Sequence, residues 1–183
     1  MDWEAFEQLC LRCRECPLGE NRKNVVIGQG QHNAPLMLIG EAPGEEEDSL
    51  GLSFVGPGGQ LLDTLLKALK IEEDKVYRTH VVKCRPPGNR MPFEEEAHVC
   101  LNHLKYQVAQ IKPKIIVCMG TIALRHIVDE NAILSESRGS WIEKKGFEIL
   151  VTFQATDILR DASKKILMWQ DFKKVEKRFR EIC

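Results

Sequence analysis

The chain has 183 residues, and its 26 basic and 27 acidic side chains leave a formal net charge of −1. A composition of 43% hydrophobic and 29% charged residues is that of a globular protein and excludes general disorder. No stretch approaches the roughly 20 apolar residues that cross a bilayer. The first residues also lack the basic start and apolar run of a signal peptide. We expect a single domain over residues 1–183 that is soluble, monomeric and intracellular (cytoplasmic), with no membrane contact.

The near-neutral charge argues against a protein that coats nucleic acid by bulk electrostatics, although a local basic face is still allowed. The seven cysteines are many for an intracellular chain of this size. An odd number in a reducing compartment argues against a full disulfide framework, so the cysteines favour metal binding.

Apolar runs and helical periodicities alternate along the chain. The runs 36–39, 76–77, 81–82, 115–119 and 149–151 are short and continuous, as in strands buried on both faces. Leucines at helical spacing follow Gly58-Gly59, and a second helix is predicted over 94–111. An amphipathic helix is predicted over 164–180, and we interpret its basic face as solvated. This alternation predicts a layered α/β domain with a mostly parallel sheet.

In sheets of this kind, ligands bind beyond the carboxyl ends of the strands. That rule selects the loops after Ile39, Val82, Met119 and Val151. We therefore look for the functional residues in these loops.

The cysteines form a pattern that indicates a metal centre. Cys13 and Cys16 form a C-x-x-C pair, and Cys84 and Cys100 lie far downstream. Four thiolates make a tetrahedral sulfur shell, which suits zinc or an iron–sulfur cluster, and the spacing does not choose between them. Cys10 is an alternative to Cys13.

The first predicted strand is followed by a glycine-rich segment. Gly40-Glu41-Ala42-Pro43-Gly44 comes first, and four glycines lie between 51 and 59. Glycine removes the Cβ and lets a ligand approach the backbone closely. Phe54 lies among these glycines, where stacking on a ligand is expected, and Glu41 is the better catalytic candidate. The run 45–48 is interpreted as a solvated acidic rim.

The sequence resembles the family 4 uracil-DNA glycosylases. The resemblance rests on an ordered set of motifs that covers nearly the whole chain. The motifs are Cys13 to Gly19, Gly40 to Gly44, Gly51 to Gly56, Gly59 to Asp63, Lys83 to Arg90, Arg138-Gly139-x-Trp141, Leu159-Arg160 and Trp169-x-Asp171.

The resemblance implies a fold, a cofactor and a reaction. The implied fold is a three-layer α/β/α sandwich around a mostly parallel four-stranded sheet. The implied cofactor is a four-iron four-sulfur cluster on Cys13, Cys16, Cys84 and Cys100, with zinc as the second choice. The implied reaction is hydrolysis of the N-glycosidic bond of a flipped deoxyuridine in DNA.

The resemblance also assigns roles to residues of the predicted pocket. Glu41 would lie near the attacked sugar carbon, where it orients water or stabilises the cationic sugar. Phe54 would stack on the base, and backbone groups from Gly40 to Ala42 would line the pocket.

Two positions depart from the family pattern. His80 stands where the family usually has an asparagine that recognises the uracil edge, and an imidazole cannot copy that bidentate contact. Gln154 replaces the histidine that stabilises the departing uracil anion, and the loss of such a donor costs roughly 10²–10³ in rate. With Glu41, these are the catalytic candidates.

The partner is expected to be DNA containing uracil or another damaged base. Contacts with the DNA are assigned to Lys83, Arg85, Arg90 and Arg160, whereas the histidines at 32, 98, 103 and 126 are interpreted as surface or helix-face residues. The two departures leave three functions open. They are excision of another base or weak excision of uracil, ordinary uracil excision, and non-catalytic DNA binding by a damage sensor or scaffold.

Overall fold

The computed structural model describes residues 1–144 and 146–183. Its centre is one sheet with the strand order β2-β1-β3-β5-β4. The strands are β1 (Leu36–Gly40), β2 (Val76–His80), β3 (Ile115–Met119), β4 (Trp141–Lys144) and β5 (Phe147–Thr152). The first three and β5 run parallel, and β4 pairs with β5 in the antiparallel direction. The sheet therefore has five strands, one more than predicted.

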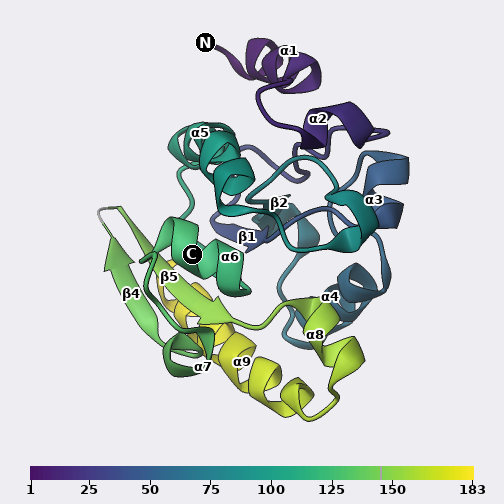
Figure 1. Ribbon diagram of the computed structural model, residues 1–183. Coiled ribbons are helices and arrows are strands. Elements are labelled where there is room, and N and C mark those ends of the chain that lie inside the picture. The colour runs from purple at the N-terminus through teal and green to yellow at the C-terminus, as the bar shows by residue number, and fades with distance from the viewer. Residues whose placement is uncertain (145) are drawn as a thin grey trace.

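Helices cover both faces of this sheet (Figure 1). The α-helices, in chain order, are α1 (Trp3–Arg12), α2 (Leu18–Asn21), α3 (Glu45–Leu50), α4 (Pro57–Ala68), α5 (Glu94–Ile111), α6 (Thr121–Ile127), α7 (Leu134–Ser137), α8 (Ala155–Arg160) and α9 (Lys164–Ile182). Two 3₁₀ turns, η1 (Glu73–Lys75) and η2 (Pro87–Asn89), complete the described elements. Among the described residues, none of these helices combines the length and the apolar character that crossing a membrane requires.

The alternation of side chains along the strands builds two apolar layers. Met37 and Ile39 of β1 point to the layer beneath α5 and α6, whereas Leu36 and Leu38 point to the layer beneath α4, α8 and α9. Successive side chains of a strand lie on opposite faces, so continuous apolar runs fill both layers. The predicted α/β/α sandwich is confirmed.

The runs 76–77 and 81–82, which were predicted as strands, give only one strand in the structure. The run 76–77 extends to His80, and the run 81–82 lies beyond the end of β2. Val81 and Val82 are buried there, and their N–H groups donate to the carbonyls of Gly40 and Glu41. The strand β4 was missed because its side chains are half-buried or exposed, so it shows no continuous apolar run.

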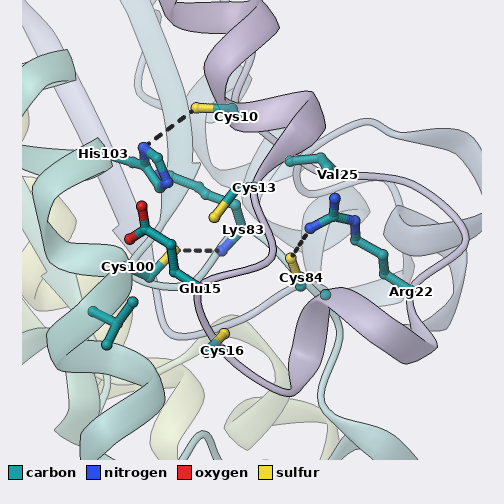
Figure 2. A pocket seen from close by; sticks show the side chains of 12 residues that line it. Cys10, Cys13, Glu15, Cys16, Arg22, Val25, Lys83, Cys84, Cys100 and His103 are labelled. Carbon is teal, nitrogen blue, oxygen red and sulfur yellow. Dashed lines mark hydrogen bonds between the residues drawn. The ribbon is translucent and has the colours of Figure 1, made fainter.

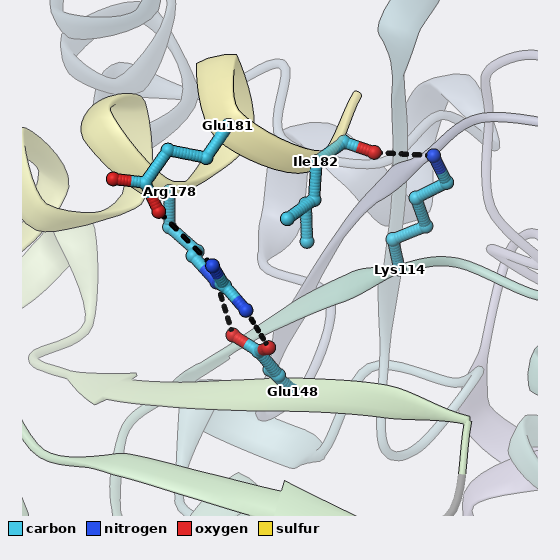
Figure 3. A network of polar contacts seen from close by, with 5 residues as sticks. All are labelled: Lys114, Glu148, Arg178, Glu181 and Ile182. Atoms are coloured by element: carbon cyan, nitrogen blue, oxygen red, sulfur yellow. Dashed lines mark hydrogen bonds and ion pairs between the residues drawn. The ribbon is translucent and has the colours of Figure 1, made fainter.

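The predicted C-terminal helix is confirmed as α9, but its basic face is less free than expected. Arg178 Nε donates to Glu148 Oε2 on β5 at 2.8 Å, and its Nη1 pairs with Glu181 at 3.0 Å (Figure 3). Lys114 donates to the carbonyl oxygen of Ile182 at the end of the same helix. These contacts fasten the helix end to the sheet.

The motif Arg138-Gly139 is explained by a buried carboxylate on α9. Asp171 is 0% exposed and accepts from Arg138 Nη1 at 2.5 Å and from Thr152 Oγ1 at 2.7 Å. Gly139 has φ +74°, and a Cβ on it would lie 2.7 Å from Asp171 Oδ1. The motif therefore helps to join β5 to α9. This contact fixes the end of β5, which precedes the functional site.

Candidate functional site

The ends of the four parallel strands meet along one edge of the sheet. Gly40 is in register with His80, and Met119 is in register with Thr152. The residues that follow each end line one cleft of about 610 Å³. The chain passes from β1 to β2 on one side of β1 and then crosses to β3 on its other side, so the cleft opens where the strand order reverses. The predicted location of the site is thus the location of this polar cleft.

Most of the predicted pocket residues line this cleft. They are Glu41, Ala42, Phe54, His80, Arg90, Gln154 and Arg160. Gly40 lies under it, because a Cβ there would meet His80 Cδ2 at 2.8 Å and Phe54 Cζ at 2.9 Å. A residue larger than glycine at position 40 would displace both rings.

Glu41 directly follows β1, and its carboxylate reaches the first turn of α6. Its Oε1 accepts a hydrogen bond from the N–H of Ile122 at 2.9 Å. Burial raises the pKa of Glu41, and the hydrogen bonds from Ile122 and from the Gln154 side chain oppose that rise. A half-buried carboxylate with a fixed orientation can hold a water molecule or face a developing positive charge.

Gly120 brings Glu41 and Gln154 together. It has φ +97°, and a Cβ on it would lie 2.7 Å from Gln154 Cγ and still closer to Glu41 Oε1. Gln154 precedes α8, where its N–H donates to Asp157 Oδ2 at 3.2 Å. The amide is therefore held beside the carboxylate, within the cleft.

Phe54 and His80 form a stacked pair at the floor of the cleft. Their ring centroids are 4.6 Å apart and their planes differ by 15°. Both side chains are buried, and Phe54 has φ +55°, which is uncommon for a residue other than glycine. Burial, and secondarily the charge of Lys83, lower the pKa of His80 to about 3, so the imidazole is neutral at physiological pH.

Two residues of the run 45–48, which was expected to be a solvated acidic rim, accept backbone hydrogen bonds, and Glu47 thereby holds the loop that carries Phe54. Glu47 accepts hydrogen bonds from the N–H groups of Gly44, Val55 and Gly56 at 3.1–3.2 Å. Asp48 is 2% exposed and accepts from the N–H of Lys23 at 2.9 Å. That interpretation was wrong for these two residues, because both carboxylates satisfy backbone donors.

The cysteines meet in a second pocket, between α1, α2 and the chain that follows β2. Cys13, Cys16, Cys84 and Cys100 line it together with Cys10 and His103. Figure 2 shows the first four sulfurs on different sides of this pocket and Cys10 farther away, beside His103. The Cys10 Sγ lies 3.6 Å from His103 Nδ1. His103 was interpreted as a surface or helix-face residue; it lies on α5 and is buried, so only the surface interpretation was wrong.

The donors of this pocket are thiols, which are the ligands of zinc and of iron–sulfur clusters. Among the described residues, no three side chains of the ligating types are close enough together to hold a metal ion. Two sulfurs already accept N–H donors, from Arg22 Nη1 to Cys84 at 3.1 Å and from the Lys83 backbone to Cys100 at 3.3 Å. Such N–H···S contacts are typical around sulfur clusters.

The predicted DNA-contacting residues differ in their availability. Lys83 is 2% exposed, and its Nζ donates to Thr79 Oγ1, the His80 carbonyl and Gln107 Oε1, each at 2.6 Å. Its ammonium cannot reach a phosphate from there, so the prediction that Lys83 contacts DNA is wrong.

The three arginines remain at or near the surface. Arg90 forms a bidentate pair with Glu96 at 2.7 and 2.8 Å, and Arg85 lies 3.5 Å from Glu45. Arg160 is exposed at the rim of the cleft. Met91 and Thr121 also line the cleft and were not predicted, because neither residue type marks a site in a sequence.

Comparisons with known proteins agree with this geometry. The family model described as "Uracil DNA glycosylase superfamily" matches residues 27–180. A type-4 uracil-DNA glycosylase of Thermotoga maritima is 39% identical over 94% of this chain and 92% of its own length. A protein of the same name from Pyrobaculum aerophilum is 36% identical over 87% of this chain and 86% of its own length. Another from Sulfurisphaera tokodaii is 39% identical over 94% of this chain and 82% of its own length. The chain belongs to the uracil DNA glycosylase superfamily, a family of DNA glycosylase enzymes.

Proposed function

We propose that this protein excises uracil, or another base that carries a carbonyl at the same edge, from DNA as a monomer in base excision repair. The observation that carries the proposal is the meeting of Glu41, Gln154 and the Phe54–His80 pair in one cleft at the carboxyl edge of the sheet. Relatives named type-4 uracil-DNA glycosylase, at 36–39% identity over most of the chain, support it.

In the proposed reaction the damaged nucleotide leaves the base stack and enters the cleft. Flipping is required because the glycosidic bond cannot be reached within a duplex. The base is proposed to stack on Phe54, whose ring and that of His80 occupy the space left by the missing Cβ of Gly40. Ala42 lines the same cleft.

Glu41 is proposed as the residue that serves the sugar. Its carboxylate, fixed by the Ile122 N–H, orients the attacking water or faces the positive charge that develops on the sugar. Gln154 is proposed to donate from its amide to the departing base. A neutral amide stabilises an anion less than a cationic imidazole does, so excision of uracil should be slower than with histidine at this position.

The cysteine pocket is proposed to hold a four-iron four-sulfur cluster on Cys13, Cys16, Cys84 and Cys100. When bound, the cluster supplies covalent iron–thiolate links between the N-terminal segment and the chain after β2. That chain includes Arg85 and Arg90, so the cluster would hold these proposed phosphate contacts beside the cleft. Arg160, which is exposed at the cleft, is also proposed to contact phosphate.

A lesion panel tests the proposed function. Oligonucleotides that carry uracil, hypoxanthine, xanthine or a normal base are incubated with cluster-replete protein, and strand cleavage at the abasic product is measured. Excision of uracil or another oxo base, lost in Glu41→Gln, is expected. Binding to damaged or abasic DNA without release of any base would instead identify a non-catalytic sensor, and would refute the enzyme assignment.

A further inference from the structure

The orientation of the His80 ring has a direct consequence for base recognition. A base that stacks on Phe54 lies parallel to the Phe54 ring, and the His80 plane differs from that ring by 15°. The centroid distance of 4.6 Å corresponds to offset stacking, so part of the Phe54 face is left uncovered by the imidazole. A base on that part would lie nearly coplanar with the imidazole and meet it edge to edge. This is the geometry of an in-plane hydrogen bond to a base edge.

The two ring nitrogens of His80 have different surroundings. Nδ1 is buried and has no hydrogen-bond partner among the described residues. Nε2 lies over Gly40, 3.4 Å from where a Cβ would be, at the floor of the cleft. A buried N–H without a partner is rarer in proteins than an unpaired lone pair. The proton of the neutral imidazole is therefore assigned to Nε2.

We propose that His80 offers the base one hydrogen-bond donor, Nε2–H, and no acceptor, so that the cleft recognises a carbonyl and ignores the neighbouring imino N–H. An asparagine amide at this position offers a donor and an acceptor side by side and therefore requires both groups of uracil. The substrate class is then oxo-pyrimidines with or without the N3 hydrogen, which includes N3-methylated uracil. The carbonyl recognised is O4, and cytosine is excluded because its amino group stands at that position and would face a second donor. This inference rests on the proposed function of the cleft.

The test compares uracil, N3-methyluracil and cytosine in single-stranded oligonucleotides, where differences in base pairing do not contribute. The wild-type protein is expected to excise uracil and N3-methyluracil at rates within about 5-fold of each other, and to leave cytosine intact. His80→Asn is expected to discriminate against N3-methyluracil by about 10- to 100-fold, because the amide acceptor then lacks a partner. His98→Asn, on the exposed face of α5, is the matched control and should behave as wild type.

A second measurement keeps the inference independent of activity and of the folding of the variant. The ¹⁵N chemical shifts of His80 in the wild-type protein are expected to show a protonated Nε2 and an unprotonated Nδ1. A protonated Nδ1 would overturn the inference. So would wild-type discrimination against N3-methyluracil of about 10-fold or more.

The failure of the proposed function has a different signature. If no base is excised, the affinity of the protein for each of the same three oligonucleotides is measured by fluorescence anisotropy. These affinities then test the recognition by His80. Equal affinity for the two uracil forms and weaker affinity for cytosine would retain the recognition by His80 while refuting the enzyme. Excision of uracil alone would retain the enzyme while refuting the recognition.

Discussion

The carboxylate of Glu41, at the end of β1, accepts a hydrogen bond from the backbone of Ile122, in the first turn of α6. The two residues are 81 positions apart in the chain and 2.9 Å apart in space. The contact joins the segments that follow the neighbouring strands β1 and β3, at the point where the strand order reverses. It fixes the direction of the carboxylate before any substrate is present, which is what preorganised catalysis requires.

Replacing Glu41 with glutamine should therefore remove activity and keep the fold. The amide oxygen can still accept from the Ile122 N–H, so the thermal midpoint should change little. Single-turnover excision of uracil should fall by about 10²- to 10⁴-fold, the usual contribution of a positioned acid–base group. Glu130→Gln, an exposed acid in the turn after α6, is the control and should leave the rate unchanged. A Glu41→Gln protein with the wild-type rate would exclude Glu41 from the reaction.

Gln154→His should accelerate the excision of uracil. The imidazole would stand beside the Glu41 carboxylate and can become cationic, so it would stabilise the departing anion better than an amide. We expect an increase of about 10-fold or more in the single-turnover rate. Gln154→Leu, which removes the donor altogether, should lower the rate below wild type. Equal rates in all three proteins would show that this side chain does not contact the leaving base.

The sequence was sufficient to place the cleft because strand ends can be located from apolar runs. The runs at 36–39 and 149–151 predicted β1 and β5, and the carboxyl-end rule then selected the loops that carry Glu41 and Gln154. The helix over 94–111 was predicted with the bounds of α5, because its periodicity lies between a proline-rich turn and a following strand.

Other features depend on contacts that periodicity does not record. The burial of Lys83 follows from the convergence of Thr79, His80 and Gln107 on its ammonium, and a lysine beside an arginine-rich loop gives no sign of this. The role of Glu47 follows from three N–H groups that lie up to nine positions away. The stacking of His80 on Phe54 joins two elements that the sequence separates by 26 positions, so it could be found only in three dimensions.

The cysteine pocket predicts a sharp division between Cys10 and the other thiols. Cys13→Ala and Cys100→Ala should each lose bound iron and visible absorbance, because each removes a proposed ligand. Both should also lower the thermal midpoint, since the N-terminal segment would lose its link to the chain after β2. Cys10→Ala should retain the full iron content, because its sulfur lies beside His103 and apart from the other four. Loss of iron in Cys10→Ala with retention in Cys13→Ala would reverse the assignment.

The positions of Arg160 and Lys83 predict opposite effects on DNA binding and stability. Arg160→Ala should weaken binding to DNA and reduce the salt dependence of the affinity by about one counterion, because its exposed guanidinium at the rim is proposed to contact phosphate. Its free energy of unfolding should stay near wild type. Lys83→Met should lower the free energy of unfolding, because three oxygens at 2.6 Å lose their common donor. A weakened salt dependence in a fully stable Lys83→Met protein would return Lys83 to the DNA interface.

Buried His80 predicts how stability depends on pH. In the folded protein burial lowers the pKa of His80 to about 3, whereas the unfolded chain titrates near the usual 6.5. Between these values the unfolded chain binds a proton at this position and the folded protein does not. The contribution of His80 to the free energy of unfolding is therefore complete above pH 6.5 and is lost progressively as the pH falls toward 3. His80→Asn lacks this contribution, whereas the carboxylates titrate in both proteins and largely cancel in the difference. Chemical denaturation at pH 7.5 and 5 should show that the wild type loses more stability than His80→Asn over this interval. An equal loss of stability in the two proteins would mean that the imidazole is solvated, and would contradict its burial against Phe54.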